Sequence, residues 1–391
     1  MSYIKLPAVL LSLLVAVVSY APPQAPDTAS IVARIEGPQS PDRGGYDSYS
    51  LREMMDRLGV RGVSIAVIRD FKIHWARAYG IADVSAGTAV DTETLFQAAS
   101  ISKPVAAMAV LRAVQDGRFS LDTDINTILT SWKIEQSRWT VTPRSLLSHT
   151  SGANDGFGFP GYAPTAALPT IVQILNGEKP SNTGPVLFAL PPGSGYKYSG
   201  GGVTIMQLAM TDVYAKPYHE LLQELVLRPI GMTRSGYEQP LSQERDRNAA
   251  RAHGTSGQAM GTKWHAYPEL AAAGLWTTPT DLAKFAMEIQ LSLQGKSNKV
   301  LSPEMARQMI TPVGVGPFAV GLTIEKRGEG WYFSHGGSNW GFRAQLIAHV
   351  SKGYGAAIMT NADRGSTLID EIIARIASVY NWDSLDKPTI R

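Results

Sequence analysis

Apolar residues along this chain recur with two different periods, which separates the expected helices from the expected strands. Spacings of three and four residues join the apolar positions of residues 46–58, and the same spacing runs from Pro104 to Gly117. Both patterns predict amphipathic helices, and Pro104 fits only a first helical turn, where its missing N–H costs nothing. Further helices are expected at residues 142–147, 203–211, 218–227, 279–293 and 368–380.

Short runs of β-branched and aromatic residues predict strands near both ends of the chain. They cover residues 63–68, 73–79, 317–324, 331–334, 342–350 and 355–360. Strands first, helices in the middle and strands last imply an α/β fold whose antiparallel sheet is flanked by helices and completed by both ends of the chain. We therefore expect an α/β domain from residues 46–120 and 261–391, with an inserted, mainly helical domain at 121–260.

The first 45 residues have the pattern of an export segment followed by a polar linker. Lys5 precedes an apolar run from Leu6 to Val18, and small residues flank the position after Ala21 where a signal peptidase would cut. A buried N-terminal strand is the alternative. Residues 1–21 are predicted to be a signal peptide and 22–45 a linker, which implies a periplasmic or secreted protein with no stable membrane span after signal removal.

Composition removes several classes of function. With 391 residues, of which 44% are hydrophobic and 18% charged, the chain can bury a large core. The net charge of +3 comes without a Lys/Arg block, so nucleic acid is not expected as a partner. The chain contains no cysteine, which excludes disulfides, thiolate catalysis and Cys-ligated zinc.

A serine and a lysine at the start of the second predicted helix are the strongest candidates for chemistry. Ser100 and Lys103 are one turn apart, on one helix face, and a lysine of lowered pKa can take the proton of a serine nucleophile. The Ser-x-x-Lys pattern alone is weak, because it also occurs at Ser2/Lys5, Ser194/Lys197 and Ser384/Lys387. Only the Ser100 copy opens a long apolar helix.

Two further segments carry glycines next to groups that can transfer protons. Tyr198 precedes Ser199 and three glycines, so a phenol there could act as a second proton acceptor, or the segment could simply be a glycine-rich helix entry with a packed tyrosine. The other segment, residues 333–339, contains His335 and Ser338. Its backbone N–H groups could form an oxyanion hole, and the alternative is a plain hairpin turn with an exposed histidine.

Other catalytic chemistries lack their sequence signals. No Gly-x-Ser-x-Gly nucleophile elbow and no His-Glu-x-x-His zinc motif is present, so neither a metal nor an organic cofactor is expected. His149 could be the general base for Ser100, but its neighbours, Leu-Leu-Ser before it and Thr-Ser-Gly after it, favour a structural role at a helix end.

Taken together, Ser100-Ile-Ser-Lys103, Tyr198-Ser-Gly200 and His335-Gly-Gly337 resemble the three motifs of class C β-lactamases. Relatives with the same motifs are low-molecular-weight penicillin-binding proteins, D-aminopeptidases and family VIII esterases. The similarity runs from about residue 46 to residue 380 and implies a β-lactamase/transpeptidase-like fold.

The resemblance implies a role for each matching residue. Ser100 would be the acylated nucleophile, Lys103 its base or proton shuttle, and Tyr198 the partner that activates Ser100 and protonates the leaving group. The N–H groups of Ser100 and Ser338 would form the oxyanion hole, and the His335-to-Gly337 segment would line the opposite wall.

Two positions depart from the pattern of the β-lactamases. Gly200 stands where the family has an asparagine that holds the substrate side chain, and His335 stands where it has a lysine that faces the substrate carboxylate. We expect His335 to titrate near neutrality and carboxylate recognition to weaken as pH rises. The resemblance implies a serine hydrolase for a small ester, amide or peptide such as a D-amino-acid amide. The alternatives are a weak β-lactamase or DD-peptidase, and a catalytically silent protein that binds cell-wall fragments.

Overall fold

The computed structural model describes residues 1–2, 27–39, 45–135, 138–155 and 158–384. The strands are β1 Gly62–Arg69, β2 Lys72–Asp83, β3 Thr88–Ala89, β4 Phe96–Gln97, β5 Trp276–Thr277, β6 Thr323–Arg327, β7 Gly330–Asn339, β8 Phe342–His349 and β9 Gly355–Thr360. The longer helices are α1 Thr28–Glu36, α2 Leu51–Leu58, α3 Ser102–Gln115, α7 Gly200–Tyr214, α12 Pro279–Leu293, α13 Pro303–Ile310 and α14 Gly365–Val379.

Shorter helical segments occupy mainly the middle of the chain. They are α4 Ile125–Ile128, α5 Pro143–Leu147, α6 Ile171–Asn176, α8 Tyr218–Leu222, α9 Arg228–Ile230, α10 Gln243–Asp246 and α11 Leu270–Ala273, with a 3-10 turn η1 at Ala99–Ile101 and a π turn η2 at Gln223–Leu227. No strand occurs in residues 121–260 as far as these are described. One buried apolar cluster nevertheless contains residues of this helical region and residues of the sheet.

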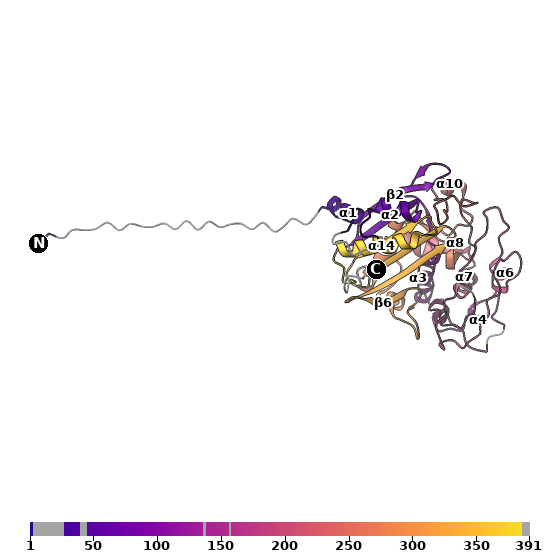
Figure 1. Ribbon diagram of the computed structural model, residues 1–391. Coiled ribbons are helices and arrows are strands. Elements are labelled where there is room, and N and C mark those ends of the chain that lie inside the picture. The colour runs from indigo at the N-terminus through magenta and orange to yellow at the C-terminus, as the bar shows by residue number, and fades with distance from the viewer. Residues whose placement is uncertain (3–26, 40–44, 136–137, 156–157, 385–391) are drawn as a thin grey trace.

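Seven strands form one antiparallel sheet in the order β3-β2-β1-β9-β8-β7-β6. The pairing of β1 with β9 joins the N-terminal and C-terminal parts of the chain. In Figure 1 the indigo α1 and α2 accordingly lie near the yellow α14. This arrangement confirms the expected α/β fold with an antiparallel sheet completed by both ends of the chain.

Both faces of the sheet are covered, because its central strands are apolar on both sides. Alternate residues of β1, such as Val63 and Ile65, pack with α1, α2 and α14, whereas Ala66 and Ile68 belong to the cluster that contains α3 and α12. The cluster that contains α3 and α12 continues into the helical region. The catalytic candidates lie on this side of the sheet, between the sheet and the helices.

Helix α1 lies in the segment that was expected to be a linker. Its residues Ile31, Val32 and Ile35 are buried against the sheet side that α14 covers. Arg375 of α14 is fully buried and donates hydrogen bonds to the carbonyl groups of Ile35 and Gly37, while Glu371 accepts from its Nε at 3.0 Å. The partners that fix α1 are more than 300 residues away in sequence, so local polarity gave no sign of them.

Two strands differ from their expected bounds near the C-terminal half of the sheet. The strand expected at 317–324 begins only at Thr323, because the chain first turns at Gly321, where φ is +88°. Strand β7 continues from Ser334 to Asn339, a stretch that was expected to be a loop. Backbone pairing with β8 extends over this whole stretch and overrides its weak strand propensity.

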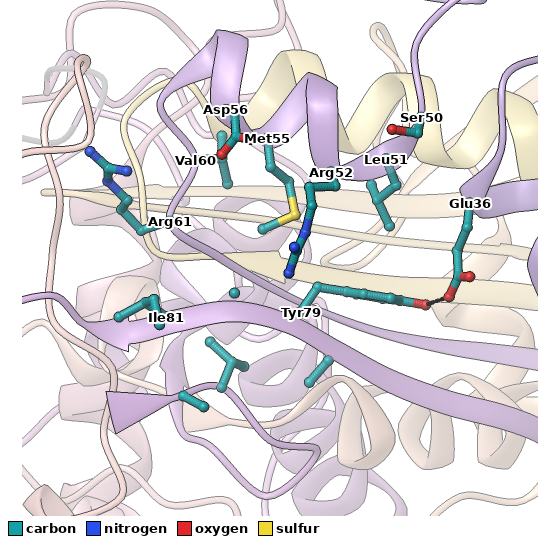
Figure 2. A pocket seen from close by; sticks show the side chains of 14 residues that line it. Glu36, Ser50, Leu51, Arg52, Met55, Asp56, Val60, Arg61, Tyr79 and Ile81 are labelled. Carbon is teal, nitrogen blue, oxygen red and sulfur yellow. Dashed lines mark hydrogen bonds between the residues drawn. The ribbon is translucent and has the colours of Figure 1, made fainter. Parts of the chain in front are cut away.

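A cavity of about 730 Å³ lies between α2 and the outer edge of β2, away from Ser100. Figure 2 shows Tyr79 lying across it, with its hydroxyl donating to Glu36 at 2.7 Å. Its lining includes Arg52, Met55 and Arg61 and none of the catalytic candidates.

The described helices include none that is both long and apolar enough to cross a bilayer. The predicted signal peptide falls almost entirely outside the described residues.

Candidate active site

Ser100 lies in a tight turn that two short strands hold in place. Strand β4 pairs with β5, and the N–H of Ala98 donates to the carbonyl of Leu275 at 2.9 Å. Ala99 then takes a positive φ of 51°, an unusual conformation for a residue with a Cβ, and begins the η1 turn. This uncommon backbone conformation directly before Ser100 sets the local course of the turn that carries the nucleophile candidate.

Lys103 lies one turn after Ser100 and is almost completely buried, with 1% exposure. Its Nζ is 3.1 Å from Oγ of Ser100 and donates to the carbonyl of Ala272 in α11 at 2.8 Å. Burial lowers the pKa of Lys103 to about 7, against a smaller opposing effect of Asp155. At neutral pH a large share of this lysine is therefore a neutral amine that can accept the serine proton.

Ser102 supports the turn and takes no part in the Ser100–Lys103 contact. Its Oγ donates to the carbonyl of Ala99 at 2.6 Å and accepts from the N–H of Leu275 at 2.9 Å. The hydroxyl of Tyr237 donates to the Ser102 carbonyl at 3.0 Å. These bonds fasten the start of α3 to the strand β5 region.

Tyr198 faces both Ser100 and Lys103 from the end of the segment that enters α7. It shares a hydrogen bond with the Ser100 side chain, and its ring centre lies 4.9 Å from the Lys103 Nζ. Burial raises the pKa of Tyr198, with the Ser100 hydrogen bond acting in the opposite direction. The phenol therefore keeps its proton at neutral pH and is suited to donate it.

Asp155 fixes the residues that follow Tyr198, and its importance had no clear sign in the sequence. Its carboxylate accepts hydrogen bonds from the Ser199 hydroxyl and, at 2.6 Å, from the N–H of Gly201 in the first turn of α7. A carboxylate at a helix N-terminus is favoured by the helix dipole. Asp155 is also close enough to raise the pKa of both Lys103 and Tyr198.

His149 lies beside Tyr198, and none of its hydrogen bonds to the described residues involves Ser100. The two rings are tilted with centres 4.3 Å apart, and Nδ1 of His149 accepts from the N–H of Ser199 at 3.2 Å. Phe318 closes the other side with an edge-on contact at 4.6 Å. Burial lowers the pKa of His149 well below its usual value, so the ring is neutral and packs as an aromatic.

Strand β7 brings its Gly337–Ser338 segment against the η1 turn. A Cβ at Gly337 would lie 2.2 Å from the carbonyl oxygen of Ala98, so only glycine permits this approach. Strand β6 pairs with residues 330–334 alone, which leaves the edge of β7 from His335 onward unpaired with β6. The backbone at Ser338 is thereby held beside the turn that carries Ser100, as an oxyanion hole requires.

The structure gives His335 a different setting from the one expected. The imidazole is buried, with 4% exposure, and its Nδ1 donates to the carbonyl of Gly336 at 2.7 Å. Burial, together with the nearby Lys103, lowers its pKa to about 3. The expected titration near neutrality is therefore wrong, because a buried imidazole beside a lysine resists protonation.

Ser100 opens into a cavity of about 310 Å³, and the described residues that line it include several that the sequence did not suggest. These are Phe159, Trp340, Arg343 and Asp363, together with Gly158, Pro160 and Asn339, beside the expected Tyr198 and Ser338. Gly200 begins α7 next to the ring of Phe159. Loop residues 158–160, the end of β7 and Arg343 of β8 meet here only through the fold.

An aromatic stack joins the two sides of this cavity. The rings of Trp340 and His265 are parallel at 3.9 Å, and His265 Nδ1 donates to the carbonyl of Pro160 at 2.9 Å. The Trp340 N–H in turn donates to the Tyr267 hydroxyl at 3.0 Å. Asn339 donates to Gln97 at 2.9 Å, which ties the end of β7 to β4.

The described residues contain no group of three or more His, Asp or Glu side chains able to hold a metal ion. The chemistry that the arrangement does permit is acyl transfer to Ser100, because a nucleophile, a base of pKa near 7, a proton donor and backbone N–H groups converge.

Comparison with known proteins gives the same picture. Residues 50–380 match the Beta-lactamase family. Protein Rv1367c of Mycobacterium tuberculosis is 27% identical over 292 residues, which are 67% of this chain and 70% of that protein. Esterase EstB of Burkholderia gladioli is 29% identical over 239 residues, 58% of this chain and 56% of the esterase.

Among solved structures, D-amino acid amidase from Ochrobactrum anthropi SV3, complexed with L-phenylalanine amide, has the same fold. It superposes with a TM-score of 0.67 over 85% of this chain and 96% of the amidase, at 21% identity. From the family match over most of its length, this chain belongs to the beta-lactamase family and is a serine hydrolase of that family.

Proposed function

We propose that this protein hydrolyses an ester or a small amide, such as that of a D-amino acid, through an acyl-Ser100 intermediate. The observation that carries the proposal is the 3.1 Å contact between Ser100 Oγ and Lys103 Nζ, with a lysine pKa of about 7. A silent binding protein would have no need of a lysine buried beside a serine, because burying an ammonium group is costly.

The first half of the reaction follows from the positions of the groups. Oγ of Ser100 attacks the substrate carbonyl carbon while its proton passes to the neutral amine of Lys103. The carbonyl oxygen becomes an oxyanion that accepts from the N–H groups of Ser100 and Ser338, where one such donor lowers the barrier by about 3 kcal/mol. Tyr198 donates its proton to the leaving oxygen or nitrogen and regains one from the Lys103 ammonium.

The second half releases the acid. A water molecule attacks the acyl-serine carbonyl, gives its proton to the same lysine and tyrosine pair, and the bond to Ser100 Oγ breaks with return of a proton to the serine. Free acid and unmodified enzyme result.

The named relatives support an ester or amide substrate without fixing the acyl group. An esterase and a D-amino acid amidase are among the proteins that this chain resembles. The two positions that differ from β-lactamases argue against efficient β-lactam hydrolysis. Gly200 has no side-chain amide that could hold a substrate, and His335 is a neutral, buried ring in place of a cation.

A side-by-side assay tests the proposal. Purified protein is offered p-nitrophenyl esters, D-amino-acid p-nitroanilides and nitrocefin, and a fluorophosphonate is used to label the nucleophile. We expect turnover of an ester or an anilide, with label mass on the peptide that contains Ser100 and loss of both in Ser100→Ala. A label on Ser148, Ser194 or Ser338 would contradict the assignment of the nucleophile. Turnover of nitrocefin alone would favour a β-lactamase.

We also propose that the protein is exported, on the pattern of residues 1–21. Expression of the full chain in a bacterial host, followed by cell fractionation and N-terminal sequencing, should find a periplasmic or secreted form that begins near residue 22. A full-length cytoplasmic protein would contradict this.

A further inference from the structure

Arg343 is the only cationic side chain among the described residues that line the cavity at Ser100. It lies on β8, directly opposite Ser338 of β7 in the antiparallel register. The group that enters this cavity when Ser100 is acylated therefore meets one guanidinium group.

The guanidinium is held rigidly, and part of it remains available. Nη1 donates to the carbonyls of Asn339 and Phe342 at 2.7 and 2.8 Å, and Nη2 donates to Asp363 at 3.0 Å. An arginine has five N–H groups, so these bonds leave Nε–H and one Nη2–H without a partner among the described residues. The side chain is 19% exposed, which means that solvent or a ligand can reach it.

Asp363 limits the kind of attraction that this site can exert. One of its oxygens accepts from Arg343 and, at 3.2 Å, from the N–H of Gly341. The opposite charges of Arg343 and Asp363 largely cancel, so the pair exerts little long-range attraction on an anion. An anion in this cavity is therefore recognised through direct hydrogen bonds from the guanidinium, which are strong and directional.

The walls between Ser100 and Arg343 favour a flat group. Phe159 lines one part of the cavity, and Trp340, stacked on His265, lines another. A volume of about 310 Å³ accommodates a group the size of a benzoyl ring with one polar substituent.

Building on the hydrolase activity proposed above, we propose that Arg343 forms a subsite for a carboxylate carried by the acyl part of the substrate. The recognised class is an acyl group, flat near the ester or amide carbonyl, whose far end is anionic. Since His335 is neutral and buried, Arg343 takes over recognition of negative charge, from the acyl side.

Two matched esters test the subsite. One is the p-nitrophenyl monoester of terephthalic acid, and the other is the p-nitrophenyl ester of terephthalamic acid, in which a neutral amide replaces the carboxylate. The wild type should favour the carboxylate ester in kcat/KM. Arg343→Gln should lower the ratio of carboxylate to amide ester about tenfold or more, mainly through KM, because a charged hydrogen bond is lost. Arg343→Lys should retain part of the preference, since lysine keeps the charge and loses the planar fork.

Arg364→Gln is the matched control. Arg364 is an exposed arginine next to Asp363, and it does not line the cavity. Removing its charge should leave the ratio within about twofold of the wild type, because exposed charges are screened. Because Arg343 also braces the β7–β8 turn, the melting temperature of each variant is measured alongside.

The outcomes separate the subsite from its alternatives. Equal losses on both esters in Arg343→Gln would make Arg343 a structural brace and overturn the subsite. A wild-type preference for the p-nitrophenyl ester of para-(aminomethyl)benzoic acid would make Asp363 the binding group and overturn it as well. The carboxylate preference should stay level from about pH 6 to about pH 9, since arginine does not titrate there.

Calorimetric binding of terephthalate keeps the subsite testable without turnover. If the wild type hydrolyses neither the esters nor the D-amino-acid anilides, the proposed function fails. Tighter binding of terephthalate than of terephthalamate, lost in Arg343→Gln, would still support the subsite. Equal binding of both acids by wild type and variant would overturn it.

Discussion

The position that a Cβ of residue 200 would take lies 2.7 Å from Cε2 of the Phe159 ring. The phenyl ring therefore occupies the space that any side chain at Gly200 would need. An asparagine side chain, which the resemblance to class C β-lactamases would place at this position, would meet the same ring.

Gly200→Asn should consequently lower both stability and activity unless the Phe159 ring is removed. The added side chain is expected to cost about 1–3 kcal/mol of folding free energy, or to displace the loop, and to lower kcat/KM. Phe159→Ala should recover most of the loss in a double-mutant cycle measured by thermal unfolding and ester hydrolysis. Gly184→Ala, with no atom within 4 Å of the new Cβ, is the control. Additive effects of the two changes would show that the residues do not compete for space.

The acid side of the pH profile should report Lys103. The lysine must be neutral to accept the serine proton, and its pKa is lowered to about 7 by burial. We expect kcat/KM for a neutral ester to rise with pH through about 7 and to level off above about pH 8. A profile that is flat down to about pH 5 would place the base elsewhere.

Lys103 and Tyr198 should behave as one unit. If they share a proton relay, Lys103→Ala or Tyr198→Phe alone costs on the order of 10³-fold or more in kcat, and the double variant costs little beyond that. Single-turnover kinetics with a p-nitrophenyl ester measures the acylation step directly. Losses that multiply in the double variant would show that the two residues act separately.

His149 should act by positioning Tyr198. His149→Phe keeps an aromatic ring in the stack and leaves the N–H of Ser199 without its acceptor, a loss of about 1–3 kcal/mol in stability. We expect a drop in kcat near tenfold with the pH limb near 7 unmoved. If His149 were the base, the limb would vanish and the drop would reach on the order of 10³-fold or more.

Glu269 should make stability depend on pH. It is fully buried just before α11, and neither carboxyl oxygen has a hydrogen-bond partner among the described residues. Burial raises its pKa from 4.5 to about 7, above the unfolded value. Its protonated form therefore supports the fold below about pH 4.5, and this contribution is lost as pH rises through about 7.

The isosteric change Glu269→Gln removes that titration. At about pH 8 this variant should melt at a higher temperature than the wild type, and its free energy of unfolding should be larger by up to a few kcal/mol. At about pH 5 the two proteins should be similarly stable. Glu288→Gln is the matched control, because Glu288 is also buried but accepts from Ser297 and from the N–H of Lys299. That variant should destabilise the protein. A wild type that stays more stable than Glu269→Gln at about pH 8 would indicate a partner for the carboxylate.

Features that depend on local sequence were predictable. Pro104 lies in the first turn of α3 and Gly117 follows the end of that helix, Pro279 opens α12 as expected, and β9 spans the predicted residues. The closeness of Ser100 and Lys103 followed from helical spacing alone. Each of these depends on residues within a few positions of one another.

Features that depend on distant partners were not predictable from the same patterns. Helix α1 is fixed by Arg375, and the extension of β7 by β8. In the sequence, Arg343 looks like an ordinary polar residue of a strand. Its place in the cavity at Ser100 becomes visible only when the fold brings it near Phe159. The burial of His335 likewise depends on packing from several elements, so its loss of basicity had no local sign.

The pairing of β1 with β9 also governs when activity can first exist. Residues 62–69 must wait for residues 355–360 before the sheet closes, a separation that makes folding slow. Ser338, whose N–H group is the second candidate oxyanion donor, is on β7 within the late half of this sheet. A partly synthesised chain already carries Ser100 and Lys103 but still lacks Ser338. The complete arrangement of the candidate site therefore forms only after β7 and its partner β8 have been made.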